Sequence, residues 1–243
     1  MKLDILAIGV HPDDVELSCA GTILKHQSYG KQVGVLDLTR GELGSRGSAE
    51  TRDEESRAAA QVLNLACRDN AEMADGFFRN TPENIKKVVH YIRRYQPEIV
   101  LANALSDRHP DHGRAAKLVA DACFYAGLIK IETYDSDGQL QKAWRPKALY
   151  HYIQDHNLVP DFVVDVTPYM DKKIEAILAY KTQFYNPDEQ QDEALPKTPI
   201  SSKAFFDYLR AKAATYGRIA NFDYAEGYQI SRTPGVNNLF DLI

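Results

Sequence analysis

Two short stretches of this chain place histidine beside aspartate. The first is His11-Pro12-Asp13-Asp14, and the second is His109-Pro110-Asp111-His112. Imidazole and carboxylate are common zinc ligands, and a catalytic zinc uses three protein ligands and keeps one position open for water. A further carboxylate beside such a metal could move protons during a reaction. We therefore interpret the two stretches together as a candidate catalytic metal site.

Each stretch alone also has an ordinary interpretation. Asp13 and Asp14 could be carboxylates at the start of a helix, where capping and the helix dipole favour them. His109 and His112 could be surface histidines in a loop. Because two matched stretches occur in similar positions, the metal site is the favoured interpretation. If the first turn is helix-like, residues 11 and 14 face the same point, while residue 13 projects differently.

The elements around both stretches predict that they lie at the same end of a sheet. The apolar run 3–10 predicts a buried strand, and the apolar spacing that follows residue 14 predicts a helix. Residues 98–103 predict a second strand, followed by the second stretch and by a helical pattern up to residue 123. In open α/β sheets, ligands bind where strands give way to helices, at the carboxyl ends of the strands.

The rest of the chain continues the alternation of strands and helices. We predict further strands at 31–38, 72–76, 147–153, 161–166 and 226–231, and further helices at 50–65, 81–95, 171–180 and 201–219. Residues 131–146 predict an irregular or hairpin segment that turns at Asp137-Gly138, and residues 186–199 predict a long loop. This order predicts one α/β domain over residues 1–243, Rossmann-like, with a mostly parallel sheet and helices on both faces.

Composition excludes several classes of protein. The chain has 243 residues, 44% of them hydrophobic, which is enough for a sizeable core, and a net charge of −5, which argues against general binding to nucleic acid or to anionic membranes. No apolar run approaches a membrane span, and the first one is too short for a signal peptide. Cys19, Cys67 and Cys123 are far apart, which predicts buried free thiols in a reducing cytoplasm.

The two histidine stretches resemble the PIG-L/LmbE family of zinc-dependent N-acetylglucosaminide deacetylases. The most similar branch is that of bacillithiol biosynthesis, which acts on N-acetylglucosaminyl-malate. The resemblance covers nearly the whole chain and includes segments 38–47, 179–184 and 224–228 as well as Arg52 with Glu55. It implies an LmbE-like fold, a small N-acetylated glucosaminide as substrate, and a homo-oligomer such as a hexamer.

The resemblance also assigns roles to residues. The implied zinc ligands are His11, Asp14 and His112, with Asp13 as the general base for attack of water on the acetamide carbonyl. His109, oriented by Asp111, would lie near the developing negative charge, and Glu42 and Arg52 would line the sugar side of the pocket. We interpret His151 and His156 as structural or surface histidines rather than as ligands.

Three questions stay open at this point. The substrate could be another N-acetylated sugar or amide, or the protein could bind sugars through its metal without turnover, although binding alone does not require Asp13. Some relatives carry a tyrosine soon after a Lys-Thr-Pro segment that helps to stabilise the oxyanion. Here no tyrosine follows Lys197-Thr198-Pro199 before Tyr208, so that role is open. Tyr185 could substitute, but an ordinary packed or exposed tyrosine is the favoured interpretation.

Overall fold

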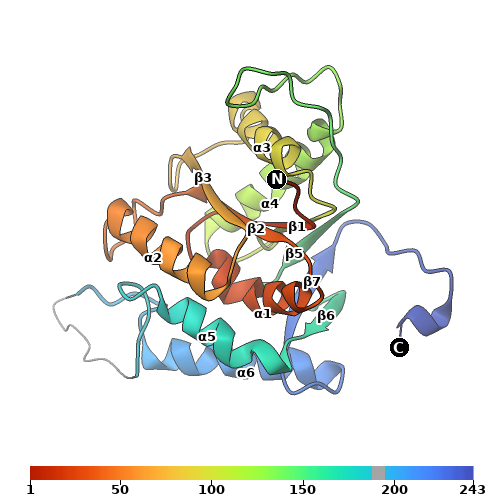
Figure 1. The fold of residues 1–243 in the computed structure, drawn as a ribbon. Coiled ribbons are helices and arrows are strands. Elements are labelled where there is room, and N and C mark those ends of the chain that lie inside the picture. The colour runs from red at the N-terminus through yellow and green to blue at the C-terminus, as the bar shows by residue number, and fades with distance from the viewer. Residues whose placement is uncertain (188–194, 243) are drawn as a thin grey trace.

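A seven-stranded sheet with helices on both faces dominates the structure, a computed structural model that describes residues 1–187 and 195–242 (Figure 1). The strands are β1 (Ile5–Gly9), β2 (Val33–Thr39), β3 (Cys67–Met73), β4 (Ile99–Ala102), β5 (Ala148–Tyr152), β6 (Phe162–Asp165) and β7 (Ala225–Ile230). The helices are α1 (Asp14–Ser28), α2 (Ala49–Val62), α3 (Pro82–Tyr95), α4 (Pro110–Ala126), α5 (Met170–Leu178) and α6 (Lys203–Ile219), with short 3-10 helices η1 (Thr167–Tyr169) and η2 (Leu239–Leu242).

The strand order β3-β2-β1-β4-β5-β7-β6 confirms the predicted mostly parallel α/β sheet. Strands β1 to β5 pair in parallel, whereas β7 runs antiparallel to both β5 and β6. Figure 1 shows α3 and α4 on one side of the sheet and α1, α2, α5 and α6 on the other. Because β1 and β4 are parallel neighbours in the centre, the turns that follow them lie side by side.

The central strand β1 packs into a core on each face, which is why its sequence is a continuous apolar run. Leu6 and Ile8 belong to the core beneath α3 and α4, while Ile5 and Ala7 belong to the core on the side of α1. All four side chains are buried. Both surfaces of the strand are thus covered, so the end of β1 is fixed in position for the residues that follow.

Helix α3 begins as the sequence predicts. The Thr81 hydroxyl accepts a hydrogen bond from the Asn84 backbone N–H at 3.3 Å, and Pro82 occupies the first turn. Proline is suited to that position because the N–H that it lacks would have no partner inside the helix. The helix ends at Tyr95, before Pro97, as expected.

The third strand corrects one prediction. We expect a strand at 72–76, but β3 runs from Cys67 to Met73, and Asp75-Gly76 lies in the turn that follows. This strand is at the edge of the sheet and its first residues are only half-buried, so it lacks the apolar pattern of a central strand. The error matters because Asp75 is part of the site described below.

Two predicted irregular segments have different outcomes. The 131–146 segment is an irregular hairpin with a bridge between Tyr134 and Leu140, and its turn places Gly138 at φ 74° with its N–H bonded to Asp135 O. The middle of the predicted loop 186–199, residues 188–194, lies outside the described residues.

All three cysteines are free, as predicted, although Cys67 is only partly buried. In the described part of the chain, no helix has the length and apolar character to span a membrane.

Candidate metal centre

The turn between β1 and α1 is tight and strained. A Cβ on Gly9 would lie 3.1 Å from Asp14 Cβ and 3.2 Å from His11 O, so the end of the strand leaves little room for a side chain. Asp13, which precedes the first residue of α1, has φ 119° and ψ −22°. A non-glycine residue in that region costs about 1–3 kcal/mol and is held there by its surroundings. The strain falls on the residue predicted to act as the base.

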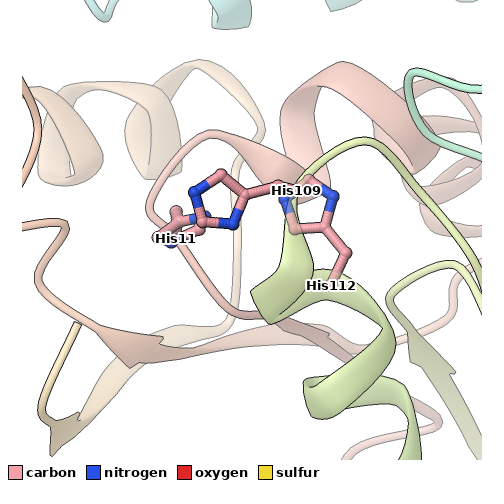
Figure 2. A group of neighbouring side chains, drawn as sticks. All are labelled: His11, His109 and His112. Carbon is pink, nitrogen blue, oxygen red and sulfur yellow. The ribbon is translucent and has the colours of Figure 1, made fainter. Parts of the chain in front are cut away.

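The second turn brings two more imidazoles to the first. Helix α4 begins at Pro110, so His109 is its N-cap and His112 lies in its first turn. Figure 2 shows the rings of these two residues beside the ring of His11. The ring centroids lie 4.7 Å apart for His11 and His109, and 5.3 Å apart for His109 and His112. The structure therefore brings together the histidines of both predicted stretches.

The Asp14 carboxylate lies between the two predicted histidine ligands. Its Oδ2 is 3.8 Å from His11 Nδ1, and its Oδ1 is 3.2 Å from His112 Nε2. Oδ2 also accepts hydrogen bonds from the backbone N–H groups of Val10 and His11 and from Asn103 Nδ2, and Oδ1 accepts one from Gln154 Nε2. Burial alone would raise the pKa of Asp14, but the charges and hydrogen bonds of the two histidines outweigh it, and the pKa is lowered well below its usual value. Asp14 is thus a fixed carboxylate anion.

Two further carboxylates orient the imidazoles from behind. Asp75 Oδ1 lies 3.0 Å from His11 Nε2, and Asp107 Oδ2 lies 2.5 Å from His112 Nδ1. A metal-binding histidine usually donates its second ring N–H to such a partner, which fixes the tautomer and the ring orientation. This arrangement leaves Nδ1 of His11 and Nε2 of His112 for a metal. The sequence motifs assign no role to either carboxylate.

The donor set and its charges suit a divalent cation. Burial by itself lowers the pKa of His11, but the nearby carboxylates of Asp111, Asp75 and Asp14 outweigh it and raise the pKa to about 10. For His112, burial likewise lowers the pKa, and Asp14 and Asp107 raise it to about 9. The carboxylates therefore attract positive charge to the imidazoles, which a metal ion supplies in place of protons.

Nitrogen and oxygen donors of this kind favour zinc or a similar borderline metal. Within the described residues, two sets of potential ligand atoms lie within 4.8 Å of one another: His11, His109 and His112, and His11, Asp75 and Asp111. The predicted set of His11, Asp14 and His112 shares the same centre but replaces His109 by Asp14. It remains a prediction.

Asp13 is buried beside Arg52. Its Oδ2 lies 3.2 Å from Arg52 Nη2, which also donates a 2.6 Å hydrogen bond to the carbonyl oxygen of Pro12. Burial raises the pKa of the Asp13 carboxyl, Arg52 partly offsets this, and the charge of Asp14 adds to it, giving a pKa of about 7. A carboxyl with that pKa can accept and return a proton near neutral pH.

Arg52 also has hydrogen-bond donors without a partner among the described residues. Its Nε and Nη1 are buried and make no hydrogen bond within the described part of the chain, and the side chain lines the cavity. These two nitrogen atoms could donate hydrogen bonds to substrate oxygens, as predicted for Arg52. The contact with Asp13 is observed, whereas the contact with substrate stays a prediction.

The other predicted site residues lie around this centre. Glu42 is exposed, is not among the cavity-lining residues, and accepts a 2.9 Å hydrogen bond from the backbone N–H of Asp75. Asp111 is buried; its carboxylate bonds to Arg114 and to the Gly76 N–H and lies 3.7 Å from His11 Nε2. Its backbone N–H, rather than its carboxylate, bonds to His109 Nδ1.

The two histidines left out of the predicted site do not direct their side chains' nitrogens into a potential metal cluster of the described residues. His151 is buried with Nδ1 bonded to Asn103 O, and His156 is exposed. Tyr185 packs against Phe206, with ring centroids 6.2 Å apart, and is not among the cavity-lining residues, whereas Tyr208 lines the cavity.

A cavity of about 460 Å³ opens from the metal centre. It reaches from the loop at Gly41–Gly44 and the turn at Asp75–Phe77 across the histidines to α6 and β7. This volume is in the range of small-molecule sites. The arrangement can therefore hold a small substrate against the metal ligands and Asp13.

Comparisons with known proteins find a matching family model and a similar fold. A family model described as PIG-L, GlcNAc-PI de-N-acetylase, matches residues 6–123, which contain both histidine stretches. The crystal structure of the conserved protein TT1542 from Thermus thermophilus superposes with a TM-score of 0.83 at 33% identity, covering 98% of each chain.

Two curated relatives carry names of different reactions. The chain is 28% identical to diacetylchitobiose deacetylase of Thermococcus kodakarensis, over 96% of this chain and 84% of that protein. It is 27% identical to 4-oxalmesaconate hydratase of Pseudomonas putida, over 71% of this chain and 70% of that protein.

The geometry predicts that Asp14→Asn weakens metal binding more than about 100-fold, because loss of a mere supporting group behind a ligand already costs about 10- to 100-fold. Metal content after dialysis against a chelator series, measured by elemental analysis, checks this. His156→Ala is the matched control and should keep the wild-type metal content. A metal that stays bound in Asp14→Asn, or is lost in His156→Ala, contradicts the site.

A second prediction concerns pH. Asp13 must be deprotonated to act as a base, so kcat/KM should rise with pH through its pKa. Removing the Arg52 guanidinium removes a positive charge that lowers this pKa, so Arg52→Ala should move the acidic limb to higher pH by about 1 unit. A pH series of initial rates measures it, with the exposed Arg57 of the same helix replaced by Ala as control. An unmoved limb, or a shift to lower pH, refutes the coupling.

Proposed function

Because this chain belongs to the PIG-L family, we propose that it is a zinc-dependent N-deacetylase that hydrolyses the acetamide of an N-acetylglucosamine conjugate and releases acetate. The observation that carries this proposal is the group formed by Asp14 and three histidines, with the separately held carboxylate of Asp13 beside it. Binding a sugar through a metal requires no such carboxylate, whereas hydrolysis requires a proton acceptor.

We further propose N-acetylglucosaminyl-malate, the bacillithiol precursor, as the physiological substrate. Support comes from the similarity of the sequence motifs to that branch, which includes the segment 38–47 and Arg52 with Glu55. The relative that acts on diacetylchitobiose makes a neutral N-acetylated disaccharide the main alternative. The enzyme would act as a homo-oligomer, as the same resemblance implies, and its free cysteines favour a reducing cytoplasm.

Asp13 is the proposed base. When bound, zinc would place a positive charge next to the carbonyl oxygen and would lower the pKa of a bound water molecule towards about 7. Asp13 would accept a proton from the attacking water and return one to the leaving amine, and its pKa of about 7 suits both transfers. Arg52 holds this carboxylate at a fixed angle, so the proton acceptor need not reorganise during the reaction.

His109 is the proposed partner of the developing oxyanion. It is half-buried in the cavity wall, beside the rings of the other two histidines. Burial and the charges of these neighbours lower the pKa of His109. In the neutral state its ring N–H can still donate a hydrogen bond to the acetamide oxygen.

Hydration of a carbon–carbon double bond is a second candidate, because one relative carries the name of a hydratase. Adding water to such a bond also needs an activated water and an acid–base group, so the same side chains would serve. The two reactions differ in their products. Acetate release from an acetylated glycoside identifies the deacetylase, and loss of the ultraviolet absorbance of 4-oxalmesaconate identifies the hydratase.

The test of the proposed function is acetate release from N-acetylglucosaminyl-malate by wild-type protein and by Asp13→Asn. The substitution keeps the shape of the side chain but removes the proton acceptor. We expect metal content to stay at the wild-type level and the rate to fall by about 10²- to 10⁴-fold.

Asp171→Asn is the matched control, since the Asp171 side chain is exposed on α5, and it should keep both metal and rate. Full activity in Asp13→Asn would remove Asp13 from its role and leave His109 as the candidate base. Loss of metal would make Asp13 a ligand. Absence of acetate release by the wild type on every acetylated glycoside would refute the deacetylase itself.

A further inference from the structure

The cavity wall carries more positive charge than the proposed chemistry uses. Four arginine or lysine side chains line the cavity: Arg52, Arg108, Lys173 and Lys212. Two of them, Lys173 on α5 and Lys212 on α6, line the cavity together with residues of β7. These four side chains differ in whether a carboxylate of the protein pairs with them.

Three of the four are paired with carboxylates. The ion pairs are Arg52 with Asp13 at 3.2 Å, Arg108 with Asp155 at 2.8 Å, and Lys173 with Glu226 at 2.6 Å. Lys212 differs, because within residues 1–187 and 195–242 no carboxylate lies within 4.0 Å of its ammonium. Its one hydrogen bond is to the carbonyl oxygen of Ile153 at 3.4 Å, which is long for an ammonium donor.

Nearby aromatic rings compensate Lys212 only in part. The ammonium lies 6.0 Å from the ring centroid of Tyr208 and 5.9 Å from that of Tyr216, at the limit for a cation–π contact. The hydroxyls of both rings are already committed, one to Asp155 O and the other to Leu158 O. With one of its three N–H groups bonded to Ile153 O, the ammonium has two left for a ligand in the cavity among the contacts of the described residues.

The Lys212 side chain is half-buried, and an ammonium partly removed from water without a counter-ion is unfavourable for the protein alone. Burial lowers the pKa of Lys212 to about 8, the charge of Lys173 lowers it further, and the more distant Asp107 and Asp155 only partly offset this. An anion bound in the cavity beside Lys212 would stabilise the charged ammonium and raise its pKa again.

Lys212 is also placed where a bound conjugate would extend. Its hydrogen-bond acceptor, Ile153, is followed directly by Gln154, whose side chain bonds to Asp14 at the metal centre. Both residues and Lys212 line the same cavity. A glycoside with its acetamide at Asp13 and the metal ligands can thus direct the group on its other side towards the ammonium.

We propose that Lys212 binds an anionic group, a carboxylate or a phosphate, on the aglycone of the substrate, and so selects acidic glucosaminides over neutral ones. This inference rests on the proposed function for the orientation of the substrate. Lys173 does not provide this selection, because Glu226 neutralises it.

The test is calorimetric binding to the metal-loaded protein of deacetylated glycosides, which cannot turn over. Glucosaminyl-malate is compared with its dimethyl ester, which keeps the malate skeleton but replaces its charges by two methyl groups, and with glucosamine 1-phosphate. We expect the wild type to bind the acid about 10- to 100-fold more tightly than the ester, and Lys212→Met to bring that ratio close to one. A preference for the phosphate over the malate conjugate, lost in the same variant, would identify phosphate as the anion.

Lys203→Met is the matched control, because Lys203 lies on the same helix but is exposed and paired with Asp207, and it should keep the wild-type ratio. Melting temperatures check that each variant is folded, and Lys212→Gln replaces Lys212→Met if the latter is not. A wild-type ratio near one, binding of no glycoside, or a ratio that survives loss of the lysine overturns the proposal. Acetate release from N-acetylglucosaminyl-malate is measured separately, so an anion preference without turnover would refute the proposed reaction and leave the Lys212 subsite standing.

Discussion

The buried carboxylate of Asp14 is the contact on which the site depends. It accepts hydrogen bonds from the end of β1 through Val10 and His11, from Asn103 after β4, and from Gln154 after β5. It also lies 3.2 Å from His112 on α4. One anion therefore ties together three neighbouring strand ends and the helix that carries the second histidine pair. Because these donors already hold it, the carboxylate can face a cation without moving.

Asp13, one residue earlier in the chain, has a different environment and therefore a different chemistry. Its strained backbone, with φ 119°, turns the side chain away from the Asp14 network and towards Arg52. The pKa of Asp14 falls far below the usual value, whereas burial keeps that of Asp13 near 7. With pKa values this far apart, Asp14 can stay a permanent anion while Asp13 accepts and releases a proton.

The sequence predicts the features that depend on local residue patterns. It does not predict contacts between residues that are far apart in the chain and meet only in the folded structure. The parallel strands, the capped start of α3 and the meeting of His11 with His112 all follow from apolar runs and motif spacing. Asp75 and Lys212 do not. Asp75 follows a half-exposed edge strand, and Lys212 is one of two lysines on its helix, with no pattern to distinguish it. Their importance arises from contacts with residues more than fifty positions away.

The site as proposed requires that Asp14, rather than His109, completes the metal coordination with His11 and His112. A crystal structure of the zinc-loaded protein tests this most directly. We predict one zinc about 2.0–2.2 Å from His11 Nδ1, from an Asp14 oxygen and from His112 Nε2, with Asp13 outside bonding distance on the open side. Zinc held instead by His11, His109 and His112, or by His11, Asp75 and Asp111, would contradict it.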